Sequence, residues 1–196
     1  MKKRRFPVLL VIGITLIALS LSLAIFYAVG SKNGEKSGEL VLEKLDKLLP
    51  ERVNGTPENY TNPNMPVLQI SGSDYVALIE IPAYGIRLPV ADKWEGRDID
   101  VCPARFYGSA YDNSLVIGGA DTKKQFSFCD KIDNGAVVTV TDMTGACFTY
   151  KVVNVHRSDK AESEWLCNGE YDLTLFCRDA LSMTYIAVRC NYAHGL

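Results

Sequence analysis

The chain has 196 residues, of which 47% are hydrophobic and 22% charged, and its formal net charge is −2. This composition is typical of a globular chain long enough for one domain plus additional segments. Residues 2–5 are all basic, and without them 17 basic residues face 23 acidic ones. The rest of the chain therefore has no basic surplus to attract nucleic acid, and no nucleic-acid partner is expected.

The N-terminal region predicts a membrane anchor. Residues 6–29 form an uncharged, mostly apolar run of 24 residues. A helix rises about 1.5 Å per residue, so this run is long enough to cross a hydrocarbon core of about 30 Å. The basic tail at 1–5, with no further Lys or Arg until Lys32, predicts a cytoplasmic N-terminus. A cleaved signal peptide is the alternative, but its apolar region is only about 7–15 residues long. We expect a single-pass anchor in the cytoplasmic membrane with the remaining chain outside the cell.

Residues 30–66 are predicted to form a stalk. Within it, residues 37–49 have helical periodicity that places Leu42, Leu45 and Leu49 on one face, and Pro50 ends the helix. This face is expected to pack on the following domain, and a lid or a dimer contact is the alternative. Asn and Pro are frequent in residues 54–66, which is typical of a linker.

Residues 67–196 predict a mainly β domain. Gly, Pro, Asn and Asp separate most of its short β-rich runs, which cover residues 75–82, 86–90, 114–119, 136–142, 148–155, 172–177 and 184–190. Seven or eight strands in about 125 residues suggest a closed β-barrel with only short helices.

The six cysteines leave several possibilities open. They are Cys102, Cys129, Cys147, Cys167, Cys177 and Cys190. Six cysteines allow 15 pairings, and the sequence does not choose among them. A location outside the cell favours some disulfides, whereas an anaerobic habitat would leave buried thiols. There is no CxxC motif and no zinc-like spacing, so neither a metal nor a cofactor is expected.

Cys177 ends a strand-like run, which is a position suited to a thiol nucleophile. Thiol catalysis commonly uses a histidine as general base or ion-pair partner. The chain has only two, His156 after a predicted strand and His194 in the C-terminal tail. The alternative is that both are ordinary surface residues.

The chain contains, in this order, the segments "IEIPAYGIRLPV", "DNSLVIGGADTKKQFSFCDKIDNGAVVTVTD", "DLTLFC" and "YIAVRC". Taken together, they resemble the sortases, membrane-anchored cysteine transpeptidases of Gram-positive bacteria. "IEIPAYGIRLPV" is similar to the sortase pattern I-x-IP-x-x-G-x-x-LPV. "DNSLVIGGADTKKQFSFCDKIDNGAVVTVTD" is similar to N-x-VIAGH followed by F-x-x-L-x-x-L-x-x-GD-x-V. "DLTLFC" and "YIAVRC" are similar to LTL-x-TC and R-x-x-V-R. The resemblance runs from about residue 75 to 190 and implies a sortase-like barrel of seven to eight strands.

The resemblance also implies which positions would carry the chemistry. In sortases a His follows the VIAG strand, a Cys follows LTL-x-T, and an Arg begins the last strand. The Cys attacks the threonyl carbonyl of an LPxTG-like sorting signal. Here the matching positions are occupied by Ala120, Arg178 and Tyr185. We therefore expect a catalytically degenerate homologue that binds or scaffolds near surface-protein or pilus assembly. Its expected partner is a sorting-signal peptide or a surface or pilus protein.

A one-residue change of register would instead make Cys177 the nucleophile. Successive side chains on a strand point to opposite faces, so Cys177 shares a face with Leu173 and Leu175, not with Phe176 and Arg178. A β-bulge would be needed to aim it into the groove. An atypical transpeptidase or protease that uses Cys177 with His156 or His194 therefore remains an alternative, as does a purely structural envelope protein.

The substituted residues also suggest what the groove could bind. Arg178 could hold a carboxylate or pair with Asp121, and Tyr185 could donate a hydrogen bond. Asp121, Arg178 and Tyr185 are therefore the groove candidates. A groove filled by the chain's own side chains is the competing interpretation.

Overall fold

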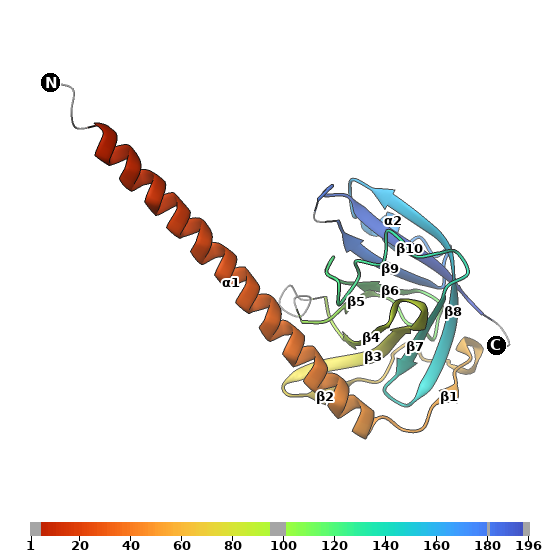
Figure 1. Ribbon diagram of the computed structural model, residues 1–196. Helices are drawn as coiled ribbons and strands as arrows, with labels where there is room; N and C mark the ends of the chain where they lie inside the picture. The colour runs from red at the N-terminus through yellow and green to blue at the C-terminus, as the bar shows by residue number, and fades with distance from the viewer. Residues whose placement is uncertain (1–4, 95–100, 180, 194–196) are drawn as a thin grey trace.

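The computed structural model describes residues 5–94, 101–179 and 181–193, and within these the side chains of 5–9 and 26–37 are excepted. A long helix projects from a barrel (Figure 1). The helices are α1 (Arg5–Leu48), η1 (Pro57–Asn59), η2 (Pro82–Tyr84) and α2 (Ser163–Leu166). The strands are β1 (Val53–Asn54), β2 (Leu68–Ile70), β3 (Ser73–Ile81), β4 (Ile86–Ala91), β5 (Ala104–Tyr107), β6 (Leu115–Gly118), β7 (Val137–Asp142), β8 (Ala146–Ser158), β9 (Leu173–Arg178) and β10 (Tyr185–Tyr192).

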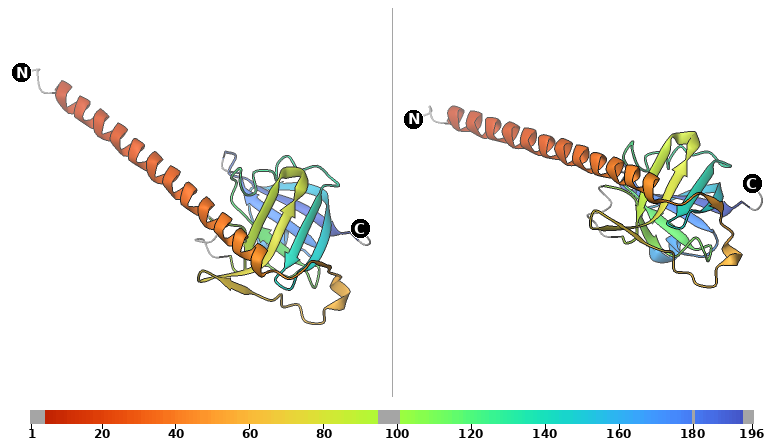
Figure 2. Two further views of the ribbon diagram at one scale, coloured as in Figure 1. Left: turned by 60° about the horizontal axis from the view of Figure 1, so that its bottom comes forward. Right: turned by 90° about the horizontal axis from the view of Figure 1, so that it is seen from below.

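The sheet closes on itself. Neighbouring strands follow the order β8-β10-β9-β6-β5-β4-β3, and β7 joins β3 to β8. Closure removes the exposed sheet edges and gives the barrel visible in Figure 2. The main core cluster fills its interior with side chains such as Ile79, Ile117, Phe148 and Val188. The expected mainly β, closed barrel is confirmed.

β9 and β10 have two distinct faces. Leu173, Leu175 and Cys177 of β9 belong to the core cluster inside the barrel. Phe176 belongs to a second cluster outside it, together with Ala187 of β10. Side chains alternate across a strand, so β9 contributes to both clusters as the period of two requires.

Three strands were not predicted from the sequence: β1, β2 and β5. They are two to four residues long and show too little alternation to be recognised. β1 starts the segment expected to be a linker, and this segment lies against the barrel. Tyr60 stacks on Tyr111 with ring centroids 3.8 Å apart. A Cβ at Gly55 would meet the Phe148 ring, so glycine permits this close approach.

The helix expected over residues 37–49 is the last part of the continuous α1. Val41 and Leu45 are buried against Ile70, Tyr75 and other barrel residues. Leu42, which was expected on the packed face, is only half-buried, whereas Val41 is buried. The packed face of the helix is therefore shifted from Leu42 toward Val41.

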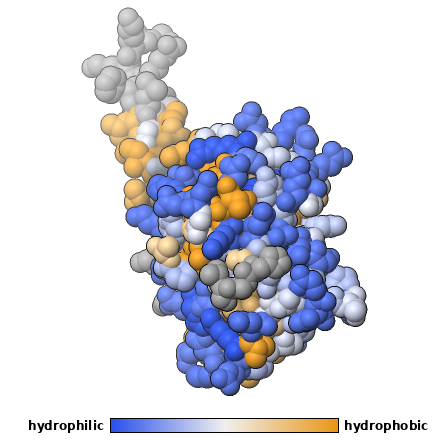
Figure 3. Space-filling model, turned by 90° about the vertical axis from the view of Figure 1, so that its right-hand side faces the viewer, coloured by the Kyte–Doolittle hydropathy of each residue, from blue (hydrophilic) through white to orange (hydrophobic). Residues whose placement is uncertain are grey.

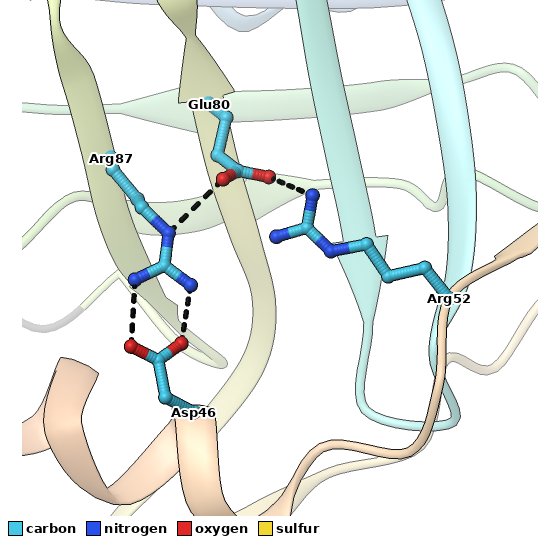
Figure 4. A network of polar contacts seen from close by, with 4 residues as sticks. All are labelled: Asp46, Arg52, Glu80 and Arg87. Carbon is cyan, nitrogen blue, oxygen red and sulfur yellow. Dashed lines mark hydrogen bonds and ion pairs between the residues drawn. The ribbon is translucent and has the colours of Figure 1, made fainter.

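A polar network reinforces this packing (Figure 4). Both guanidinium Nη atoms of Arg87 donate to the Asp46 carboxylate on α1, and its Nε donates to Glu80 at 3.0 Å. Arg52 pairs with the other Glu80 oxygen at 2.7 Å. Because these side chains are partly exposed, their ion pairs contribute little to the free energy of unfolding. Their main effect is to fix the orientation of the helix on the barrel.

The N-terminal half of α1 extends away from the barrel. Its described apolar side chains are more than half exposed at most positions, among them Leu16 at 62% and Ile17 at 65%. Figure 3 shows orange side chains on the projecting helix and largely hydrophilic side chains over the visible face of the barrel. Over the part of the chain that the structure describes, no helix reaches the length and hydropathy of a membrane span.

Candidate functional site

Three strand ends form one rim of the barrel. β6 and β9 are parallel, with Gly118 beside Phe176, and β9 and β10 are antiparallel, with Arg178 beside Tyr185. Ala120 follows β6 at the end where Arg178 completes β9. The register therefore brings Ala120, Arg178 and Tyr185 to adjacent strand ends.

Arg178 and Tyr185 contact each other at this rim. The guanidinium carbon of Arg178 lies 5.6 Å from the centroid of the Tyr185 ring, within the range of a cation–π contact. Nε of Arg178 donates a hydrogen bond to the Met183 carbonyl at 3.3 Å. Arg178 is exposed and Tyr185 half-buried. Both polar groups are therefore within reach of a ligand at the rim.

Cys177 points the other way, into the barrel. It is 2% exposed, and its thiol donates to the Phe126 carbonyl at 3.6 Å. The pairing of β9 with β10 runs from Leu173 to Arg178 without a register shift, so no bulge turns Cys177 toward the outer face.

The structure does not bring His156 to Cys177. His156 lies on β8 opposite Ala187, which in turn lies opposite Phe176. It therefore shares the outer face with Phe176 and lies two strands from β9, a distance of about 10 Å. Its Nε2 is hydrogen-bonded to Asn154 at 2.8 Å. His194, the other histidine considered, lies outside the described residues.

A small cavity of about 210 Å³ adjoins Cys177 on the inner side of the rim. Its lining includes the carboxylates of Asp121, Asp130 and Asp179, together with Lys131. Hydrogen bonds from the Leu181 and Ser182 backbone and from the Ser182 side chain hold the pKa of Asp179 below its usual value. Asp121 thus faces this cavity, whereas Arg178 belongs to the opposite face of β9.

The outer faces of β6 and β9 are covered by aromatic rings. Trp94 lies 5.2 Å from Phe176 and Phe106 lies 5.4 Å from it, measured between ring centroids. A Cβ at Gly118 would collide with both Trp94 and Phe176. The similar sortase pattern VIAGH has alanine at this position, so the glycine of "VIGG" makes room for Trp94.

The segment that connects β8 to β9, residues 159–172, covers the outer faces of β9 and β10. We call it the α2 segment. It presents Leu166, which is 2% exposed, to the outer cluster. Trp165 and Cys167 of the same segment pack against that cluster as well. The chain's own side chains therefore cover this part of the outer surface.

Arg189 of β10 holds the α2 segment in place. Its Nη1 donates to the Leu166 carbonyl at 3.0 Å and to the Thr174 hydroxyl at 2.8 Å, and its Nη2 donates to the Trp165 carbonyl. The guanidinium carbon lies 5.2 Å from the Trp165 ring and 5.3 Å from the Tyr171 ring. Arg189 is only 1% exposed. Burial lowers its pKa, but an arginine remains protonated near neutral pH.

Sequence reasoning assigned no role to Arg189. Within the described part of the chain its Nε has no hydrogen-bond partner. Two signals were available: Arg189 matches the second arginine of the R-x-x-V-R pattern, and the period of two places it on the face of Tyr185 and Ala187. The acceptors are backbone carbonyls, which no side-chain motif reveals.

Of the comparisons with known proteins, the one with solved structures identifies the fold. No protein-family model and no curated protein matches the sequence. Among solved structures, sortase C1 from Streptococcus agalactiae superposes with a TM-score of 0.57 at 20% identity, over 66% of this chain and 72% of that one. The fold is that of the sortases.

Two further structures extend the likeness. Sortase A from Corynebacterium diphtheriae gives a TM-score of 0.56 at 16% identity, over 62% of this chain, and the match spans 61% of that sortase's length. Sortase C-1 from Actinomyces oris gives 0.54 at 17% identity, over 79% of this chain and 96% of that one. At these identities the likeness concerns the sortase fold, and the roles of individual residues must come from the geometry of this chain.

Proposed function

We propose that this chain is a catalytically degenerate protein of the sortase fold, which binds or scaffolds near surface-protein or pilus assembly. One observation carries the proposal. The rim positions that match the sortase His, Cys and Arg are occupied by Ala120, Arg178 and Tyr185, and the strand register brings these residues to adjacent strand ends.

The substitutions remove the parts that transpeptidation requires. Ala120 cannot accept a proton, Arg178 cannot act as a nucleophile, and Tyr185 lacks the fixed positive charge of an arginine. Loss of a general base or of a nucleophile each lowers the rate by orders of magnitude. Arg178 instead presents a permanent cation with planar donors, which suits a carboxylate on a peptide ligand.

The membrane location belongs to the same proposal. Residues 6–29 are uncharged in the sequence and lie within the continuous α1. The structure describes the side chains of only residues 10–25 of this apolar run. We propose that this part of α1 anchors the chain, with the N-terminus in the cytoplasm and the barrel outside. Added protease should then digest or release the barrel in intact protoplasts, and full protection would contradict this topology.

An atypical cysteine transpeptidase or protease is the second candidate, because Cys177 lines the cavity at the rim. This candidate requires a base that reaches Cys177, and His156 is on the other face of the sheet. A purely structural envelope protein is the third candidate. It requires neither peptide binding nor turnover.

The test combines turnover and binding on the full chain in detergent. A fluorogenic LPxTG-like peptide should remain uncleaved, while the same peptide, or one from a neighbouring surface protein, binds in a fluorescence anisotropy titration. Arg178→Ala should weaken that binding, and Leu181→Ala, a change in the exposed loop beyond β9, should not. Cleavage that disappears in Cys177→Ala would favour the cysteine enzyme. The absence of both binding and cleavage would favour the structural protein.

A further inference from the structure

Cys177 has a neighbour that the proposed function does not use. Cys129, in the connection between β6 and β7, is 0% exposed and belongs to the same core cluster as Cys177. The backbone N–H of Cys129 donates to the Phe126 carbonyl at 3.0 Å, and the Cys177 thiol donates to the same oxygen at 3.6 Å. The two cysteines thus converge on one carbonyl, and the Cys177 thiol lies close enough to Cys129 to raise the pKa of the Cys129 thiol.

We propose that Cys129 and Cys177 form a dithiol site that closes into a disulfide, with low-molecular-weight disulfides such as oxidised glutathione as its oxidant. This inference is independent of the proposed function, because it concerns the inner face of β9 and not the rim positions. It also assigns one pairing among the several that the six cysteines leave open.

The cavity determines which thiol reacts first. Cys177 lines the 210 Å³ cavity at the rim, together with Phe126 and Ile186, whereas Cys129 is fully buried in the core. A disulfide sulfur presented at the rim therefore meets Cys177 before Cys129. Burial raises the pKa of the Cys129 thiol, and the neighbouring Cys177 thiol raises that pKa further. Cys129 is consequently suited to the second, intramolecular step, in which its partner is already in place.

The exchange is balanced in atoms and electrons. The Cys177 thiolate attacks one sulfur of oxidised glutathione, which forms a mixed disulfide and releases one glutathione thiolate. Cys129 then loses its proton and attacks the Cys177 sulfur, which forms the protein disulfide and releases the second glutathione. Two cysteines are oxidised, one glutathione disulfide is reduced to two thiols, and the two protons end on glutathione.

The other buried thiol in this core is less well placed for Cys177. Cys190 lies opposite Leu173, whereas Cys177 lies opposite Ile186, so the two are four residues apart along the pairing of β9 with β10. This separation is about 13 Å. Cys147, beside β1, and Cys167, at the end of α2, are half-buried at other places in the fold and provide matched controls.

Closing the bond would tie the β6–β7 connection to the end of β9. This connection inserts Phe126, Phe128 and Ile132 into the core, and it begins at Ala120 on the rim. A cross-link between residues far apart in sequence restricts the unfolded chain, so the oxidised protein should unfold at a higher temperature than the reduced one.

The experiment uses the full chain in detergent, fully reduced and then equilibrated in glutathione buffers of increasing oxidised fraction. Free thiols are blocked with N-ethylmaleimide under acid quench, and disulfide-linked peptides are identified by mass spectrometry. Unfolding temperatures are recorded for oxidised and reduced samples of the wild type and of Cys177→Ser, Cys147→Ser and Cys167→Ser.

The expected result is a peptide pair joined through Cys129 and Cys177, which loses two hydrogens and becomes the predominant cross-link as the oxidised fraction rises. The unfolding temperature should rise on oxidation in the wild type, Cys147→Ser and Cys167→Ser, and should not rise in Cys177→Ser. A predominant link from Cys129 to Cys190, or no protein disulfide at any buffer composition, would overturn the assignment. The wild-type peptide map decides the matter even if Cys177→Ser fails to fold.

Discussion

The two faces of β9 and β10 show how differently one pair of strands can be used. The inner face carries Leu175, Cys177 and Val188 into a continuous apolar core. The outer face carries Thr174, Arg178 and Arg189. Arg178 contacts the Met183 carbonyl and the Tyr185 ring, and Arg189 donates to the Thr174 hydroxyl and to a carbonyl of the α2 segment. The inner face supplies packing free energy, and the outer face presents polar groups at the rim and holds the α2 segment.

The comparison indicates that the core of the barrel does not depend on the residues at the rim. The substitutions at the rim are on the outer side or at strand ends, where they leave the inner packing intact. Residues such as Trp94 and Leu166 cover the outer surface with side chains of the chain itself. The packing of the inner face and the exposed groups at the rim can therefore be perturbed by separate sets of variants.

The largest effect is expected on the inner face. Leu175 is completely buried, so Leu175→Ala should lower the free energy of unfolding by about 2–5 kcal/mol through lost burial and the cavity it leaves. Leu181→Ala is the matched control, because Leu181 is 96% exposed and its truncation should change stability by less than about 0.5 kcal/mol. Chemical denaturation measures both. Equal losses would mean that Leu175 is not in the core.

An intermediate effect is expected for the residue that holds the α2 segment. Arg189→Met leaves the Trp165 and Leu166 carbonyls without their donor and should destabilise the protein by about 1–3 kcal/mol. The α2 segment should also open more often, so trypsin should cleave after Lys160 faster than in the wild type. Arg87→Met, which removes an arginine far from this segment, is the control. Unchanged cleavage at Lys160 would show that Arg189 does not hold the segment.

A smaller effect should appear when the sortase residue types are restored at the rim. In the triple variant Ala120→His, Arg178→Cys, Tyr185→Arg, a nearby imidazolium and guanidinium should lower the pKa of the introduced thiol by about one unit, or about 1.4 kcal/mol. Alkylation at position 178 near neutral pH should therefore be several-fold faster than in Arg178→Cys alone. Identical rate–pH profiles in a folded protein would mean that the three positions do not meet.

The smallest effect concerns the contact between α1 and the barrel. Arg87→Ala removes the partner of Asp46 and Glu80, and at these exposed sites it should cost at most about 1 kcal/mol. The hydrogen bond from Arg87 holds the pKa of Asp46 below its ordinary value of about 3.9. The ion pair therefore contributes above that pH and is lost as the pH falls through the lowered pKa. The stability difference between wild type and variant should shrink below about pH 4, and a constant difference would contradict the pairing.

Much of the barrel could be predicted from the sequence, because its longer strands alternate clearly and end at turn residues. Gly135 precedes β7 and Gly145 lies between β7 and β8, and their φ angles of +87° and +86° favour glycine. β1, β2 and β5 could not be predicted, because two to four residues carry too little periodicity.

The site was predictable only in part. The period of two correctly assigned Cys177 and Arg178 to opposite faces of β9. It gave no indication of the Trp94 ring over Gly118 or of the α2 carbonyls on Arg189, because both contacts join segments far apart in the chain. The pairing of Cys129 with Cys177 around the Phe126 carbonyl is likewise a product of tertiary structure and not of cysteine spacing.

Thiol accessibility tests the central claim, the register of β9, most directly. The rate of iodoacetamide labelling is compared at Cys177 in the wild type and at the thiol introduced in Arg178→Cys, with peptide mapping to identify each site. The account predicts fast labelling at position 178, on the exposed outer face, and labelling at least tenfold slower at Cys177, on the buried inner face. Rapid labelling of Cys177 together with protection of position 178 would contradict the register and return Cys177 to the role of nucleophile.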